Sequence, residues 1–253
     1  MVSTRRTKEF PEQLDTPSRS NIRASTPSKS VATRKSKSAV PNSQWAHMAT
    51  PTTLLWLFVS LPLVIWDTGY VLLRPHSMPG GSLHWPIWSP YELYGQIDYV
   101  YGWKAFNEGN GFTAAQGTLN VIETAMYLYY LYVVLSHGQK TKVLGKKRPV
   151  GSRIVGELTV GGRQGAGAVL VGFSAAVMTL SKTVLYWANE YYSSFSNIGH
   201  NTAVDLFFIW IIPNGAWIVL STYMTYIMGS EILEGLSLAA GGASFSSDDE
   251  KSE

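Results

Sequence analysis

The sequence predicts an all-α, polytopic membrane protein, a bundle of four transmembrane helices with an interfacial helix in its first lumenal loop. Apolar residues dominate four stretches that each exceed the roughly 20 residues needed to cross about 30 Å of hydrocarbon. Asp67 lies in the first of these stretches and Glu123 in the second, where a charged side chain is costly enough to indicate a function. The predicted spans are residues 51–73, 114–136, 166–187 and 203–228.

The overall composition conceals these spans, because polar segments flank them. The 253 residues include 15% charged side chains and carry a net charge of +3, as an ordinary soluble domain would. The chain has no cysteine, which excludes disulfides, cysteine-ligated zinc and a thiol nucleophile. The histidines are scattered without the spacing of metal ligands, so we expect no metal and no other cofactor.

Three regions are predicted along the chain. Residues 1–45 are basic and rich in Ser, Thr and Pro, which favours a disordered tail. Residues 46–229 form the membrane domain, with a basic loop at 137–165, and residues 230–253 form an acidic tail. Because basic residues gather in the first tail and in that loop, both termini and the loop are predicted to face the cytosol. This sorting explains the basic segments, so no nucleic-acid partner is expected.

The predicted lumenal loop between the first two spans is crowded with Trp and Tyr, which favour the headgroup boundary of a bilayer. A short interfacial helix is expected near residues 90–107. Two interpretations remain open. The helix either caps a cavity between the spans or belongs to an aromatic belt that only anchors the protein.

The second span carries a polar and aromatic stripe. Gln116, Asn120, Glu123, Tyr127 and Tyr130 recur at spacings of three and four, so they lie on one helix face and should contact protein rather than lipid.

The third and fourth spans offer partners for that stripe. Lys182, which shares a face with Tyr186, is an obvious counter-ion for the buried carboxylates. Pro213 predicts a kink and is followed by Asn214 and Trp217, one turn apart. These spans are expected to converge on a pocket. Alternatively, the buried charges only fix helix register.

Several segments resemble the EXPERA family, which contains emopamil-binding sterol isomerases and sigma-two-type receptors. The sharpest similarity is the run Asn-Gly-Ala-Trp-Ile-Val-Leu at 214–220. Residues 184–187, Glu190 and the stretch 103–110 are also similar, as is Asp67 with residues 70–72. The resemblance extends over residues 52–229.

The resemblance implies a four-helix domain of the endoplasmic reticulum membrane that encloses a cavity for sterols or amphipathic amines. It assigns the carboxylate positions of the site, and hence the catalytic roles, to Asp67 and Glu123. Together with the stripe, it identifies the candidate substrate-binding residues, which are Tyr70, Asn120, Tyr127, Tyr186, Glu190, Asn214 and Trp217.

The leading functional hypothesis is a sterol or isoprenoid double-bond isomerase of the 8-to-7 type. In that reaction an acid protonates the alkene and a base then removes a proton from the carbocation. The family's isomerases also use a histidine about one turn before the first-span carboxylate, and residues 61–66 contain none. Either a carboxyl group takes the acid role, or the protein binds a sterol or other lipid without converting it and assists trafficking. A structural role is a third possibility, and the oligomeric state is not predicted.

Overall fold

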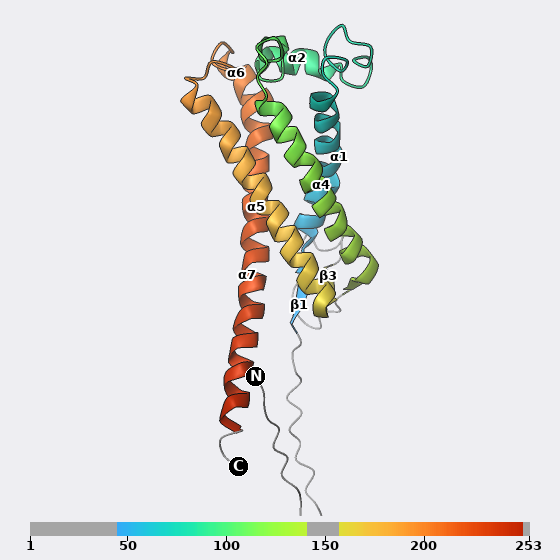
Figure 1. Ribbon diagram of the computed structural model, residues 1–253, viewed down its shortest axis with the longest axis vertical. Helices are drawn as coiled ribbons and strands as arrows, with labels where there is room; N and C mark the ends of the chain where they lie inside the picture. The colour runs from blue at the N-terminus through green and yellow to red at the C-terminus, as the bar shows by residue number, and fades with distance from the viewer. Residues whose placement is uncertain (1–44, 141–156, 250–253) are drawn as a thin grey trace, which may run out of the picture. The chain divides into compact units, whose positions relative to one another are not determined.

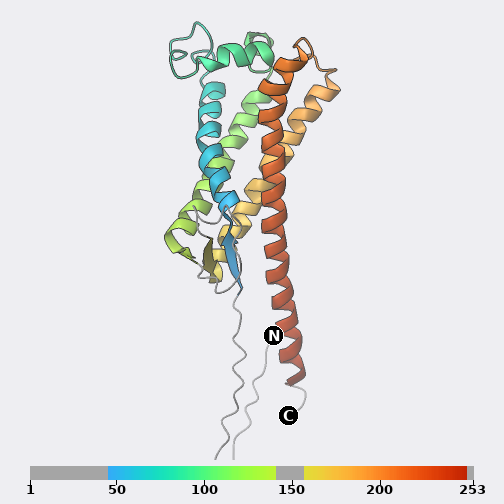
Figure 2. The ribbon, with the colours of Figure 1, turned by 180° about the vertical axis from the view of Figure 1, so that it is seen from behind.

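The computed structural model describes residues 45–140 and 157–249, with side chains described as far as residue 241. Most of the predicted N-terminal tail, the middle of the basic loop and the last four residues of the chain lie outside these ranges. Four helices are long and apolar enough to cross a bilayer, which confirms the predicted fold class and makes the chain an integral membrane protein. They are α1 (Pro51–Leu72), α4 (Phe112–His137), α5 (Gly162–Tyr192) and the stretch Ala203–Gly241, most of which belongs to α7 (Ile212–Asp249) (Figures 1 and 2).

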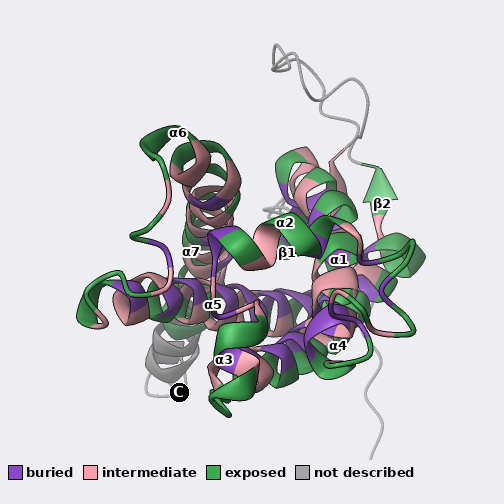
Figure 3. Ribbon diagram, turned by 90° about the horizontal axis from the view of Figure 1, so that it is seen from above, coloured by how far each residue is buried: buried purple, intermediate pink, exposed green. Residues whose placement is uncertain are grey.

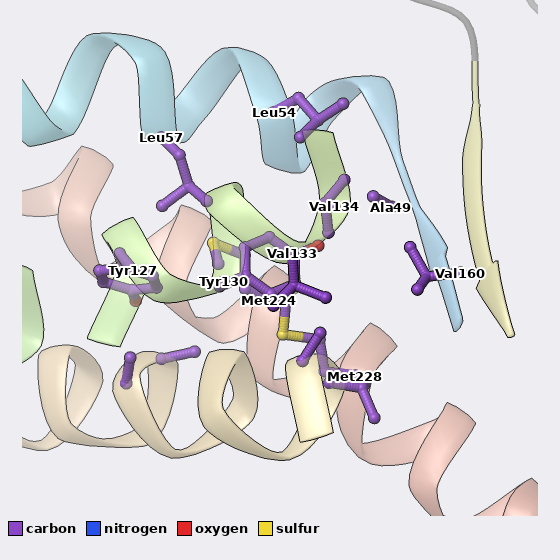
Figure 4. Close-up of a cluster of buried hydrophobic side chains, with 14 of the residues drawn as sticks. Ala49, Leu54, Leu57, Tyr127, Tyr130, Val133, Val134, Val160, Met224 and Met228 are labelled. Carbon is purple, nitrogen blue, oxygen red and sulfur yellow. The ribbon is translucent and has the colours of Figure 1, made fainter. Parts of the chain in front are cut away.

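The four helices pack in a row. α1 contacts α4, α4 contacts α5, and α5 contacts α7. A buried cluster joins them, with Leu57 of α1, Tyr130 of α4 and Met224 of α7 meeting at its centre (Figure 4). Small residues on α5 permit this approach, because a Cβ atom at Gly172 would lie only 2.9 Å from the Tyr130 ring and 3.1 Å from Met228. α1, α4 and α5 each contain many buried residues. The residues of α7 up to 241 are mostly half-buried or exposed (Figure 3).

One end of the bundle is covered by the connection between α1 and α4, and we call this the capped end. The single helix predicted at 90–107 is two helices, α2 (Pro90–Ile97) and α3 (Trp103–Asn107). The chain doubles back between them so closely that a Cβ atom at Gly102 would lie 2.5 Å from the carbonyl oxygen of Gly95. Asp98 stabilises the turn, because its Oδ1 accepts a hydrogen bond from the N–H of Val100 at 3.1 Å.

The opposite end carries a small antiparallel sheet that sequence reasoning missed, and we call it the sheet end. Its strands β1 (Ala46–Ala49), β3 (Leu158–Gly161) and β2 (Gln139–Lys140) lie in the order β1-β3-β2. The loop predicted at 137–165 is therefore shorter than expected, since α5 already begins at Gly162. Strands this short have no periodicity of their own and form only because distant segments pair.

The last span is less regular than predicted. It begins with α6 (Ala203–Asp205) and a π-helical segment, Leu206–Ile211, which ends two residues before Pro213. Proline has no N–H for the carbonyl four residues earlier, and a π-helical turn is one way to absorb that missing bond. α7 then runs without a break to Asp249, so much of the predicted acidic tail at 230–253 is helical.

Candidate functional site

A cavity of about 420 Å³ lies inside the capped half of the bundle. This volume is within the range of small-molecule sites. The four long helices and α2 all contribute to its walls, which are mostly aromatic and aliphatic with a few polar groups. The aromatic and polar residues among the lining residues are Trp66, Asp67, Tyr91, Tyr94, Tyr101, Gln116, Asn120, Lys182, Thr183, Tyr186, Asn214 and Trp217.

Asp67 is the carboxylate of this cavity. Its Oδ1 accepts a 2.6 Å hydrogen bond from the hydroxyl of Tyr91, which α2 places over it. The Tyr91 ring in turn stacks on Tyr70 with centroids 3.8 Å apart. Burial, and next the nearby charge of Asp67, raise the pKa of the Tyr91 hydroxyl, so this group stays a neutral donor. The cap therefore holds the site carboxylate by a directed hydrogen bond.

Lys182 is the cation of the cavity, and it is already paired. Its Nζ lies 2.9 Å from Oε2 of Glu123 and also donates to Oδ1 of Asn120. Thr179 donates to the same carboxylate oxygen at 2.8 Å. The counter-ion predicted for the buried carboxylates is thus found, and it pairs with Glu123.

Glu123 does not line the large cavity. It is 3% exposed and lies with Tyr127 against a second, much smaller cavity of about 20 Å³. Of the two members of the ion pair, only Lys182 contacts the large cavity. Because Glu123 balances Lys182, Asp67 is the acidic group left to face a ligand there.

Asp98 is a second buried carboxylate at the capped end, and sequence reasoning missed it. Its Oδ2 accepts hydrogen bonds from the Tyr186 hydroxyl and, at 2.9 Å, from the indole N–H of Trp210. Burial raises the pKa of Asp98 to about 6, although these donors oppose the shift. In sequence it is one acidic residue in an aromatic loop, and its neighbours show no periodicity that would mark it.

The structure brings most of the predicted site residues together. Asn120, Tyr186, Asn214 and Trp217 line the large cavity with Asp67. Tyr70 and Glu190, also predicted, do not line it. The predicted aromatic loop also contributes Tyr91, Tyr94 and Tyr101 to the walls, which agrees with the capping interpretation.

Tyr70 and Glu190 lie behind the cavity walls. The Tyr70 hydroxyl donates to the carbonyl of Tyr101 at 2.9 Å. Glu190 is fully buried, and its Oε1 accepts a 2.8 Å hydrogen bond from Asn197 in the turn after α5. Both residues hold the capped end in place.

Within 45–140 and 157–249, no three His, Asp or Glu side chains cluster as metal ligands do. The arrangement offers instead an apolar chamber with one carboxylate, one paired ammonium and several hydroxyl and amide groups. The chain matches no protein-family model, and comparisons with curated proteins and with solved structures find no match.

Proposed function

We propose that this protein binds a sterol-like or isoprenoid-like lipid in the large cavity and assists its movement within or between membranes. The observation that supports it most is the cavity of about 420 Å³ built between membrane-spanning helices, with aromatic and aliphatic walls and a few polar groups. Such walls suit an apolar ligand body, and the polar groups suit a single hydroxyl or amine at one end of it.

The arrangement of the helices indicates where a ligand gains access. α1 and α7 are the two ends of the row of packed helices. They touch toward the sheet end, where Trp56 and Trp217 meet edge to face with centroids 4.9 Å apart. Nearer the capped end, the cavity lies between Leu63 of α1 and Ile209, just before α7. A ligand dissolved in the bilayer can reach it between these helices, while α2 covers it at the capped end.

Binding without turnover is favoured over catalysis by the position of Glu123. An alkene isomerase needs an acid and a base that both reach the reacting carbons. Glu123 is paired with Lys182 and lies outside the large cavity, which leaves Asp67 as its carboxylate.

Isomerisation remains a second candidate because of one specific feature. Asp67 shares the cavity with the rings of Trp66 and Trp217, and aromatic faces stabilise a nearby cation. In this alternative, a protonated Asp67 gives its proton to one alkene carbon of the ligand, and the resulting Asp67 carboxylate removes a proton from a carbon next to the cation. We further propose, from the resemblance in sequence, that the chain is an EXPERA-type protein of the endoplasmic reticulum.

The test is ligand capture by the purified full-length protein. A photoreactive cholesterol analogue is crosslinked in detergent micelles, and the labelled peptides are identified by mass spectrometry. We expect label on the cavity walls and competition by unlabelled sterol. Trp217→Ala should lower capture at least about tenfold, which corresponds to about 1.4 kcal/mol. Phe58→Ala is the matched control, because Phe58 is 78% exposed on α1.

Asp67→Asn tests the polar end of the site, with Glu92→Gln on the exposed face of α2 as its control. Label confined to the outer surface, unaffected by Trp217→Ala, would refute ligand binding. Incubation with an 8-unsaturated sterol in deuterated water separates the two candidates, since an isomerase leaves deuterium in a 7-unsaturated product.

A further inference from the structure

The small cavity beside Glu123 contains an unsatisfied charged atom. Oε2 of Glu123 accepts from Lys182 and Thr179, but its Oε1 is buried and has no hydrogen-bond partner among the described residues. A buried carboxylate oxygen without a donor carries the full desolvation penalty of that oxygen. Oε1 therefore needs a further hydrogen-bond donor.

The cavity has the size and lining that one water molecule requires. Its volume is about 20 Å³, and a buried water needs at least roughly 10–15 Å³ together with two or more polar partners. Ser60, Thr124, Thr179 and Tyr127 line it beside Glu123. A metal cation is disfavoured, since the site has one carboxylate and that carboxylate already holds an ammonium.

We propose that this cavity is a binding site for a single internal water molecule, which donates a hydrogen bond to Oε1 of Glu123. The water completes the coordination of the carboxylate, and it accounts for a Glu–Lys pair being tolerated at this depth in an apolar bundle.

The same geometry gives Trp217 a second role. Trp217 and Val64 line both cavities, so they form the wall between them. On one side the wall faces the ligand cavity with Lys182, and on the other it faces the hydrated Glu123. Trp217 thereby keeps the water away from a bound ligand. This role of the wall rests on the proposed function, whereas the water site itself does not.

Radiolytic footprinting of the full-length protein in detergent tests the water site. X-rays convert bound water into hydroxyl radicals, which oxidise the side chains that touch it, and mass spectrometry locates the products. Tyr127 and Tyr130 are matched, since both are buried on α4 but only Tyr127 lines the small cavity. We expect Tyr127 to be oxidised at least fivefold more than Tyr130. Equal, low oxidation of both would overturn the proposal.

A cavity-filling variant identifies the source of the radicals. Ser60→Val should lower Tyr127 oxidation to the level of Tyr130, while the control Ser221→Val, at another buried serine that does not line this cavity, should leave it unchanged. Tyr127 oxidation that persists in a folded Ser60→Val protein would contradict the water site. If Ser60→Val does not fold, the wild-type comparison above decides.

The wall is tested separately. Trp217→Ala should raise Tyr127 oxidation, because the two cavities join, and unchanged oxidation would refute the partition. None of these readouts uses a ligand. Failure of sterol capture with a positive footprint would therefore remove the proposed function and keep the water site, and the reverse result would remove only the water site.

Discussion

At the scale of single residues, the pairing of Glu123 with Lys182 has the largest consequence. Two charges in an apolar bundle are tolerated only when they satisfy each other and the surrounding atoms supply further hydrogen bonds. Here Asn120 and Thr179 supply them, one on the ammonium and one on the carboxylate. The pair joins α4 to α5 at one register, and only its Lys182 side also lines the large cavity.

Removal of the cation should destabilise the protein strongly. Lys182→Met leaves Glu123 as a buried, unpaired carboxylate, and we expect a loss of about 3 kcal/mol in the free energy of unfolding. Thermal or SDS unfolding in detergent measures it. The double variant Glu123→Gln with Lys182→Met should recover most of the loss. Lys104→Met, at an exposed lysine, should stay within about 0.5 kcal/mol of wild type. If Lys182→Met were as harmless, the pair would not support the fold.

Asp98 makes stability depend on pH. Its pKa is raised from 3.8 to about 6 in the folded protein, chiefly by burial. The folded state therefore holds this proton more tightly than the unfolded state. The contribution of Asp98 to stability is fully present below about pH 4 and is lost as pH rises through about 6.

A pKa raised from 3.8 to about 6 corresponds to about 3 kcal/mol in the free energy of unfolding. Asp98→Asn should remove that part of the slope when unfolding is measured between about pH 4 and 7. The control is Asp205→Asn. Asp205 is a carboxylate at the same end, in α6, and it accepts a hydrogen bond from Thr202. This variant should retain the slope. An Asp98→Asn slope equal to that of wild type would show that Asp98 does not titrate in this range.

At the scale of secondary-structure elements, both ends of the bundle are held by contacts between distant segments. The turn after α5 holds the capped end, since Asn201 donates to the carbonyl of Ile97 at 2.7 Å. At the sheet end, Glu231 of α7 holds strand β1. Its Oε2 lies 2.5 Å from Nδ1 of His47, whose Nε2 lies 2.9 Å from the Tyr130 hydroxyl.

Loss of that carboxylate should release β1. In Glu231→Ala the buried His47 loses one of its two partners, and the N–H of Met48 loses its contact with Oε1. We expect amide hydrogen exchange of residues 45–49 to become at least about tenfold faster, measured by mass spectrometry. Glu234→Ala, at an exposed position one turn further along α7, is the control. Unchanged exchange in Glu231→Ala would mean that the sheet alone holds β1.

At the scale of the whole molecule, the basic residues predict which face of the membrane each end occupies. The sheet end carries the basic loop, and positive residues favour the cytosolic side. The capped end is then predicted to face the lumen. This orientation stays a prediction that a glycosylation test can decide.

The loop between α1 and α2 contains a position, Gly80, where a glycosylation acceptor can be introduced with little strain. Gly80→Asn creates the acceptor Asn-Gly-Ser, and asparagine tolerates the positive φ of 86° better than most residues do. We expect a glycosylated product in microsomes, visible as an endoglycosidase-sensitive band shift. Gln139→Asn creates Asn-Lys-Thr at the sheet end and should stay unmodified. Modification at residue 139 and not at residue 80 would invert the orientation.

Much of this architecture could be predicted because it depends on local properties of the chain. Four apolar runs of about 20 residues predict spans in almost any context, and all four helices begin within four residues of the expected start. The last two end later than predicted, at Tyr192 rather than 187 and at Gly241 rather than 228. The periodic stripe on the second span likewise predicted the face of α4 that contacts protein rather than lipid. The aromatic loop left two interpretations open, a cap or an anchoring belt, and Tyr91, Tyr94 and Tyr101 line the large cavity in the structure.

The sequence by itself thus determined the fold class and a set of residues from which the site is built. Only the tertiary structure decided how those residues divide between two cavities. Whether Lys182 meets Glu123 or Asp67, and whether Asp98 is an exposed loop residue or a buried acceptor, depends on the rotation and separation of helices that are distant in sequence. The pairing of β1 with β3 is equally non-local. Hydrophobicity and periodicity are properties of local segments of sequence, so they can be read from the sequence alone. The contacts between distant segments depend on how the helices pack, so only the tertiary structure shows them.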